Sequence, residues 1–193
     1  MSYAFHDPDL GREISFREAT VADDLHRIHD WMNQEHVIPF WELARPVEGI
    51  RKYIEENLAD EHQTPYIGSL DGEPISYWEA YSVPDDVVGR YYEPDPADRG
   101  VHLLIGPPEY LGRGLALPLL RAMTAFQLSY PGVQRVVAEP DVRNESMIHV
   151  FGRCGYEKQK EIDLPDKRAA LMFCDKKRFL GLFGALFAEE VSR

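Results

Sequence analysis

The stretch from His102 to Ala116 (HLLIGPPEYLGRGLA) joins an apolar strand, a loop with two closely spaced glycines and the start of a helix. Backbone N–H groups at such a junction point outward at the positive end of the helix, which suits a pyrophosphate. Gly112 and Gly114 would let phosphates approach the backbone, because a side chain there would hold them away. The alternative is an ordinary glycine-rich turn between a strand and a helix. The pattern predicts a binding loop for a phosphorylated ligand.

The rest of the sequence predicts the strands and helices that must position this loop. Alternating or short apolar runs predict strands, and Asp71-Gly72 is a strong hairpin-turn dipeptide. Apolar residues at helical spacing predict helices, and Thr20 with Asp23 fits a capping box. The expected strands are 12–18, 65–70, 73–83, 101–105, 133–139, 156–164 and 169–173, and the expected helices are 20–33, 47–58, 115–130, 144–153 and 176–191. This order mixes hairpins with βαβ units and predicts an α/β (α+β) fold with a mixed central sheet flanked by helices.

Composition narrows the class of protein. A chain of 193 residues fits one domain spanning 1–193, with two small domains as the less favoured alternative. Its 21 basic and 33 acidic residues give a net charge of −12, which argues against a nucleic-acid partner. The start of the chain lacks the pattern of a signal peptide, and no window approaches the ~18–20 apolar residues of a membrane span, so we expect a cytoplasmic protein without stable membrane insertion. Two cysteines and seven histidines without metal-ligand spacing predict neither a disulfide framework nor a metal site.

The glycine-rich loop resembles the acyl-CoA-binding loop of the GNAT N-acyltransferase superfamily, whose pattern is Gln/Arg-x-x-Gly-x-Gly/Ala. Gly114 and Ala116 match it, whereas Leu111 stands where Gln or Arg is usual. The following strand, Asn144, and a helix ending at Gly155-Tyr156 are also typical of the family. Position 151, where many members carry a tyrosine that protonates the departing thiolate, is Phe. The resemblance implies acetyl-CoA (or another acyl-CoA) as co-substrate without a metal. The implied cofactor-binding residues are Leu104, Ile105, Gly106, Gly112, Arg113, Gly114, Leu115, Ala116, Asn144 and Phe151.

Five separated blocks between about residues 12 and 180 are similar to the hydroxylysine acyltransferases of hydroxamate siderophore biosynthesis, such as those of the aerobactin and mycobactin pathways. The blocks lie at 36–41, 71–81, 98–106, 139–144 and 164–172. This resemblance implies a single-domain GNAT-fold enzyme of iron acquisition. Its reaction would move an acyl group, in the first instance acetyl, from CoA to the hydroxylamine nitrogen of N6-hydroxylysine or a related hydroxylated diamine, giving a hydroxamate.

The same resemblance implies His102 and Asp141 as catalytic residues. A hydroxylamine nitrogen is mostly unprotonated at neutral pH, so the enzyme must remove a proton only as the N–C bond forms, and an imidazole with a pKa of about 6.5 suits that task. Asp141 would orient His102 or hold the hydroxylamine OH; alternatively it caps the next helix. A backbone N–H near Ile105 or Gly106 would polarise the thioester carbonyl. Without the flanking motif, His102 would be read as a core histidine.

The hydroxylated amine would be bound by residues from several blocks. Tyr77, Glu79 and Tyr81 alternate along one strand and therefore share a face. A carboxylate and two phenols suit a cationic α-amino group beside an aliphatic stem, although ordinary sheet packing is the alternative. The predicted amine-binding residues are His36, Trp41, Tyr77, Glu79, Tyr81 and Asp98.

The sequence leaves two alternative functions and more than one role for the last helix. Aminoglycoside 6′-N-acetyltransferases share the Tyr-Leu-Gly-x-Gly loop but tend to carry Asp where this chain has His102. A non-catalytic acyl-CoA-binding GNAT module is kept open by Leu111 and Phe151. The last helix is amphipathic and predicts core packing, with a homodimer or membrane-surface contact as alternatives. Its apolar stripe comprises Phe179, Leu182, Phe183, Leu186 and Phe187.

Overall fold

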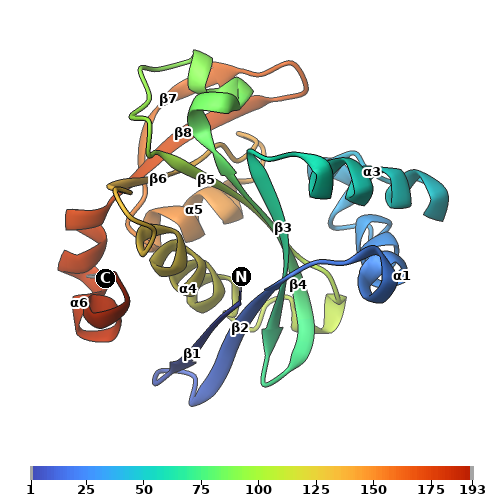
Figure 1. The fold of residues 1–193 in the computed structure, drawn as a ribbon, viewed down its shortest axis with the longest axis horizontal. Coiled ribbons are helices and arrows are strands. Elements are labelled where there is room, and N and C mark those ends of the chain that lie inside the picture. The colour runs from blue at the N-terminus through green and yellow to red at the C-terminus, as the bar shows by residue number, and fades with distance from the viewer. Residues whose placement is uncertain (1, 192–193) are drawn as a thin grey trace. The chain divides into compact units, whose positions relative to one another are not determined.

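A computed structural model describes residues 2–191 of the chain and the side chains of residues 2–187, so the ends of the range 1–193 lie outside it (Figure 1). Within the described part, eight strands form one mixed sheet in the order β1-β2-β3-β4-β5-β6-β8-β7. The strands are β1 (Tyr3–Asp7), β2 (Arg12–Glu18), β3 (Gln63–Leu70), β4 (Glu73–Ser82), β5 (Arg99–Ile105), β6 (Arg135–Ala138), β7 (Glu157–Asp163) and β8 (Arg168–Asp175). The helices are α1 (Val21–Met32), α2 (Ile38–Trp41), α3 (Val47–Ala59), α4 (Ala116–Leu128), α5 (Glu145–Arg153) and α6 (Lys176–Val191). The expected α/β class is confirmed.

The chain divides into two compact units. The first comprises Met1–Glu79 and Leu103–Pro118, and the second comprises Ala80–His102 and Leu119–Arg193. The boundaries fall inside β4, β5 and α4 rather than in a linker.

The first unit is built on antiparallel strands. β1 pairs with β2 and β2 with β3, and β3 turns into β4 at Asp71 (φ 51°) and Gly72 (φ 80°). Two positive φ angles in a two-residue loop match the turn that this dipeptide predicts. Helices α1 and α3 lie side by side (Figure 1). The main core of this unit includes Leu25, Ile28, Met32, Ile50, Ile54, Ile67, Tyr77 and Leu104.

Strand β1 was not among the expected elements. Its apolar residues are too few for a clear period-2 pattern. The signal lies instead in the turn that follows, where the Asp7 carboxylate accepts the N–H groups of Asp9 (2.9 Å) and Leu10 (3.1 Å). Gly11, at φ 62°, completes the turn by donating its N–H to the Asp7 carbonyl (2.8 Å). An aspartate that starts such a turn ahead of a glycine indicates a hairpin.

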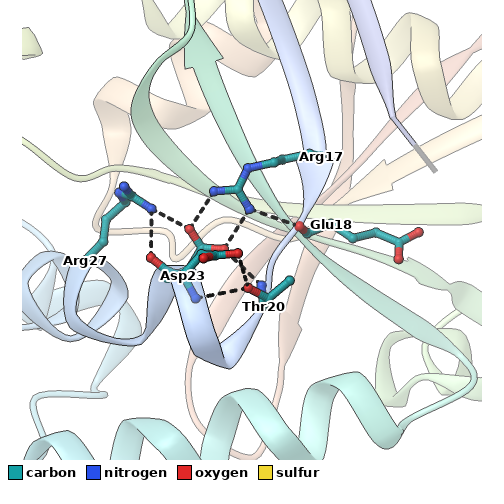
Figure 2. Close-up of polar contacts among 6 residues, drawn as sticks. Arg17, Glu18, Thr20, Asp23 and Arg27 are labelled. Carbon is teal, nitrogen blue, oxygen red and sulfur yellow. Dashed lines mark hydrogen bonds and ion pairs between the residues drawn. The ribbon is translucent and has the colours of Figure 1, made fainter.

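A buried carboxylate anchors the start of α1 to β2. Thr20 caps the helix as expected, accepting the Asp23 N–H at 3.1 Å, but the carboxylate that receives the Thr20 N–H is that of Asp24 (2.9 Å). Asp24 also accepts two hydrogen bonds of 2.7 Å from Arg17 and one from Arg27. Figure 2 shows both arginines pointing toward the first turn of the helix. Burial alone would raise the pKa of Asp24, but these donors hold it below its ordinary value.

The second unit combines parallel and antiparallel pairing. β5 runs parallel to β6, whereas β8 is antiparallel to both β6 and β7. Its core includes Tyr81, Val88, Val137, Ile162, Ala169 and Leu171.

The last helix, α6, packs into the second unit through part of its predicted stripe. Phe179 and Phe187 are fully buried, which confirms core packing for these two. Leu182 was expected on the same face but is 54% exposed. No helix within residues 2–191 has both the length and the apolar character of a membrane crossing. A homodimer contact through α6 stays a prediction.

Candidate active site

His102 on β5 and Glu139, the residue directly after β6, form a pair where these parallel strands lie side by side. The register aligns Arg99 with Val136 and Gly100 with Val137, so two residues further on His102 lies beside Glu139. Imidazole Nε2 contacts the Oε1 atom of Glu139. The carboxylate side chain is only 3% exposed, while that of His102 is 32% exposed. The arrangement joins a buried anion to a histidine that solvent reaches.

Two further groups surround the Glu139 carboxylate. The Tyr81 hydroxyl donates to Oε2 at 2.6 Å, and Lys167 Nζ lies 3.9 Å from Oε1. Burial alone would raise the pKa of Glu139, but His102, Lys167 and the Tyr81 hydroxyl together lower it to about 2. Burial and the charge of Glu139 raise the pKa of Tyr81 well above its ordinary value, so this phenol stays a hydrogen-bond donor. Glu139 is therefore ionised at neutral pH and acts only as an acceptor.

A glycine on β5 makes room for this arrangement. A Cβ atom at Gly100 would lie 2.0 Å from the Tyr81 ring, so no other residue fits there without moving the phenol. The Tyr81 ring centroid lies 4.9 Å from that of His102. Gly100 thus allows Tyr81 to reach Glu139 and pack against the imidazole.

The residue that contacts the His102 imidazole is Glu139, and the predicted orienting role of Asp141 stays a prediction. Asp141 is held by Arg143, whose Nε and Nη2 atoms donate to its two oxygens over 2.6–3.0 Å and whose backbone N–H adds a 2.8 Å bond. These bonds lower the pKa of Asp141. Nor does Asp141 cap α5, because Asn144 does so by accepting the Met147 N–H at 3.2 Å. Whether Asp141 holds the hydroxylamine OH stays a prediction.

A second buried carboxylate, Glu79, gathers polar groups in the first unit. Glu79 is 5% exposed, and its Oε1 atom accepts hydrogen bonds from Tyr53, from Asn57 (3.0 Å) and from Tyr77 (3.0 Å). Burial and the charge of Glu79 raise the pKa of both phenols well above their ordinary value. The Trp41 ring packs edge-on against Tyr77, with centroids 5.7 Å apart. The predicted residues Trp41, Tyr77 and Glu79 therefore do come together.

The apolar residues of the helix that supplies Tyr53 and Asn57, with Leu58 at helical spacing from Ile54, predict a slightly different buried face. Asn57 is 5% exposed, whereas Leu58 is 43% exposed. Asn57 is satisfied inside the protein by Glu79 and by Gln63, which donates to its Oδ1 at 2.9 Å. A polar residue one turn after a tyrosine on a buried stripe is the signal that could have located this site.

Three other predicted amine-binding residues have different partners. Tyr81 binds Glu139, as described above. Asp98 is 2% exposed and accepts from Tyr92 (2.7 Å), from the Asp95 N–H (3.1 Å) and from Arg135 (3.4 Å), which is a structural arrangement within the second unit. His36 Nε2 is 2.8 Å from the Ile105 carbonyl oxygen.

The glycine-rich loop has the form that a phosphate-binding backbone requires. Gly112 (φ 69°) and Gly114 (φ 75°) adopt conformations that favour glycine, and a Cβ atom at either would meet nothing within 4 Å. Residues 111–114 are exposed, while Leu115 is buried and anchors the loop ahead of α4, whose first residue is Ala116. Arg113 lies over the Tyr110 ring, 5.9 Å from its centroid. The open backbone fits the pyrophosphate of a CoA molecule.

The end of β5 differs from the expected oxyanion site in one respect. The Gly106 N–H donates to the Ile75 carbonyl at 3.0 Å, so it is already engaged inside the protein. This leaves Ile105 N–H as the predicted donor to a thioester carbonyl. Leu104 is 6% exposed and belongs to the core of the first unit.

Phe151 lies in the core of the second unit. It is 3% exposed and packs edge-on against Tyr156, with ring centroids 4.9 Å apart. The Tyr156 hydroxyl and Thr124 Oγ1 are 2.9 Å apart. Phe151 has no proton to give, so the usual general acid is missing from this position.

Comparisons with curated proteins place these features in a known context. The chain is 36% identical over 178 residues to an N(6)-hydroxylysine O-acetyltransferase of Escherichia coli, covering 92% of this chain and 56% of that protein. It is 32% identical to an aminoglycoside N(6′)-acetyltransferase type 1 of Klebsiella pneumoniae, covering 81% and 80%. It is 30% identical to an N-hydroxyputrescine acetyltransferase of Acinetobacter baumannii, covering 86% and 79%. The chain thus spans little more than half the length of the E. coli relative.

The chain is also similar to solved structures and matches a family model. An uncharacterized protein of Bacillus halodurans is 42% identical with a TM-score of 0.93, covering 98% of this chain and 97% of that one. The aminoglycoside acetyltransferase AAC(6′)-Ib in complex with coenzyme A is 29% identical with a TM-score of 0.78, covering 86% and 96%. The model of the acetyltransferase (GNAT) domain matches residues 20–164. The chain therefore belongs to the GNAT acetyltransferase family.

Proposed function

We propose that this chain transfers the acyl group of an acyl-CoA, in the first instance acetyl, to the hydroxylamine nitrogen of N6-hydroxylysine or a related hydroxylated diamine. The observation that carries the proposal is the pairing of His102 on β5 with the buried, ionised Glu139 at the end of β6. Support also comes from relatives whose names specify hydroxylated amines as their substrates. The hydroxamate product suits siderophore biosynthesis.

The reaction needs a base that acts as the new bond forms. The neutral hydroxylamine nitrogen attacks the thioester carbonyl carbon, and the nitrogen loses its proton to His102 in the tetrahedral intermediate. When the C–S bond breaks, the electron pair leaves with sulfur, and protonated His102 returns a proton to the thiolate. The products are a hydroxamate and free CoA. His102 takes both steps because Phe151 cannot supply the second proton.

Glu139 is a positioning residue in this scheme. An ionised carboxylate only accepts hydrogen bonds, so its contact with Nε2 assigns the N–H to Nε2 of His102. The neutral imidazole held in this tautomer then accepts the substrate proton. The nearby negative charge stabilises the imidazolium that forms during the reaction.

Glu79 is the centre of the proposed amine site. Its carboxylate is fixed by Tyr53, Asn57 and Tyr77 and would attract the cationic α-amino group of hydroxylysine. The Trp41 ring beside Tyr77 offers an apolar surface for the aliphatic stem. These roles extend the predicted binding residues by Tyr53 and Asn57.

The acyl donor would be held by the backbone of the glycine-rich loop. The amides from Arg113 to Ala116 take the pyrophosphate, since Leu111 offers no polar group. The Ile105 N–H is the proposed donor to the thioester carbonyl.

Release of CoA thiol from acetyl-CoA tests the proposal, with N6-hydroxylysine, lysine and kanamycin compared as acceptors. We expect turnover with hydroxylysine and far less with lysine, whose ammonium must first lose a proton. The hydroxamate is identified by its ferric complex, which an O-acetylated hydroxylamine does not form in the same way. The proposal would be contradicted if only lysine were acylated, or if several hydroxylated diamines were tested and none were acylated.

An aminoglycoside acetyltransferase is the second candidate, because relatives with that name match this chain over a similar share of both lengths. His102 argues against this candidate. Aminoglycoside 6′-N-acetyltransferases tend to carry Asp at this position, which suits an amine that arrives as an ammonium. Turnover with kanamycin alone would establish this candidate. Protection from thermal unfolding by CoA without any turnover would indicate an acyl-CoA-binding module instead.

A further inference from the structure

The peptide between Ile105 and Gly106 is hydrogen-bonded on both sides within the first unit. Its N–H donates to the Ile75 carbonyl (3.0 Å), and its carbonyl oxygen lies 2.8 Å from His36 Nε2. A carbonyl only accepts, so His36 is the donor and its proton is on Nε2. This peptide is the last of β5, directly before the loop that carries Gly112 and Gly114.

The segment after α1 holds His36 in this place. Val37, the next residue, is 2% exposed in the core of the unit, and its N–H donates to the Gln34 carbonyl at 2.9 Å. The Gln34 N–H in turn donates to the Trp31 carbonyl at 3.1 Å. A buried anchor and successive turns thus fix the backbone from which the histidine side chain extends.

Helix α1, directly before this segment, packs against Gly106. A Cβ atom at Gly106 would lie 2.1 Å from the Trp31 ring, which is 6% exposed. Trp31 and His36 therefore contact the two residues of one peptide, the first by packing and the second by a hydrogen bond.

We propose that His36 is a positioning residue for the acyl-CoA site: its Nε2–H holds the Ile105 carbonyl and thereby fixes the end of β5 where the donor binds. This inference rests on the proposed acyl-CoA transfer, but not on which amine is the acceptor. A strand end that is ordered in advance loses less conformational freedom when the ligand binds, so affinity for CoA rises. His36 thus serves the acyl donor rather than the amine that it was predicted to bind.

Three substitutions at His36 separate the hydrogen bond from the ring. His36→Phe keeps a ring without the donor, and His36→Gln places an amide nitrogen at the ε position. His36→Asn has the same amide one bond too short to reach. Glu35→Gln, at an exposed neighbour in the same segment, is the matched control. The readouts are the dissociation constant of CoA by calorimetry, KM for acetyl-CoA and for hydroxylysine, and Tm as a check of folding.

Loss of one neutral hydrogen bond predicts about a 2- to 10-fold rise in the CoA dissociation constant and acetyl-CoA KM for His36→Phe and His36→Asn. His36→Gln and Glu35→Gln should stay near the wild type, and KM for hydroxylysine should not move. A rise in the hydroxylysine KM alone would overturn the proposal, and so would unchanged CoA affinity in His36→Phe. If no hydroxylamine is acylated, the CoA dissociation constants still decide the role of His36 separately from the proposed function.

Discussion

Imidazole Nε2 of His102, on β5, contacts the Oε1 atom of Glu139, the residue directly after the parallel strand β6. The pair resembles the carboxylate–histidine arrangement that other enzymes use to fix the tautomer of a base. Lys167 and Tyr81 complete the surroundings of the carboxylate, so it remains ionised although buried. The chemistry of the proposed reaction depends on this pair.

Glu139→Gln should lower kcat about 10-fold or more, because the amide keeps the shape but loses the charge that stabilises imidazolium. It should also shift the acidic limb of the kcat/KM profile to lower pH, because protonated His102 is no longer stabilised by the negative charge of Glu139. A purely structural role would leave that limb in place. The measurement is a pH profile of thiol release at saturating acetyl-CoA.

Asp141→Asn provides the comparison for this prediction. Because Asp141 pairs with Arg143, its substitution should leave the acidic limb unchanged, and any effect should appear in KM for the hydroxylamine. If the acidic limb shifted in Asp141→Asn and stayed in place in Glu139→Gln, Asp141 rather than Glu139 would be the residue that orients His102.

Gly100→Ala should destabilise the protein by about 1–3 kcal/mol, because the new Cβ overlaps the Tyr81 ring. Gly152→Ala is the matched control: it lies in α5, where a Cβ meets nothing within 4 Å, and should be neutral or stabilising by up to about 1 kcal/mol. Urea unfolding of both variants measures the difference. Equal stability of the two would show that Tyr81 moves at no cost.

Glu79→Gln should raise KM for hydroxylysine about 10-fold, as expected for the loss of one charge-assisted contact, and leave CoA affinity unchanged. Tyr53→Phe, which removes one donor to the carboxylate but keeps its charge, should have a smaller effect. Steady-state kinetics with each substrate varied in turn gives the values. Unchanged KM in Glu79→Gln would remove Glu79 from the amine site.

Asp24→Asn should cost about 1–3 kcal/mol at neutral pH through lost bonds to Arg17 and Arg27. The pKa of Asp24 is lower in the folded state than in the unfolded chain. Its contribution to the free energy of unfolding is therefore complete above the unfolded-state pKa of about 3.9. That contribution is lost as the pH falls through the folded-state pKa. The stability gap between wild type and variant should therefore narrow on acidification below about pH 4. Asp23→Asn, at the exposed neighbouring carboxylate, serves as control, and a gap independent of pH would be inconsistent with this assignment.

The general fold and the glycine-rich loop could be predicted from the sequence because they depend on local patterns. Asp71-Gly72 specified its turn, Thr20 capped α1, and Gly112 and Gly114 adopted positive φ. Such features follow from the preferences of a few adjacent residues.

The partner of His102 depended instead on strand register, which local patterns do not fix. Glu139 ends the expected strand at 133–139, but only the pairing of Gly100 with Val137 shows that it faces His102. By Asp141 the chain has left β6 and forms a bridge with Ala169 of β8. Likewise, the choice of Asn57 over Leu58 for the buried face of α3 depends on Glu79 and Gln63, which are distant in sequence.

The most direct measurement is the rate of hydroxamate formation from acetyl-CoA and N6-hydroxylysine by the wild type and by His102→Ala, with the CoA dissociation constant of each. We expect the wild type to form hydroxamate and the variant to do so with kcat lower by about 100-fold or more, while CoA affinity stays nearly intact. Absence of hydroxamate with the wild type, or equal kcat in the variant, would contradict a hydroxylamine acyltransferase that uses His102 as its base.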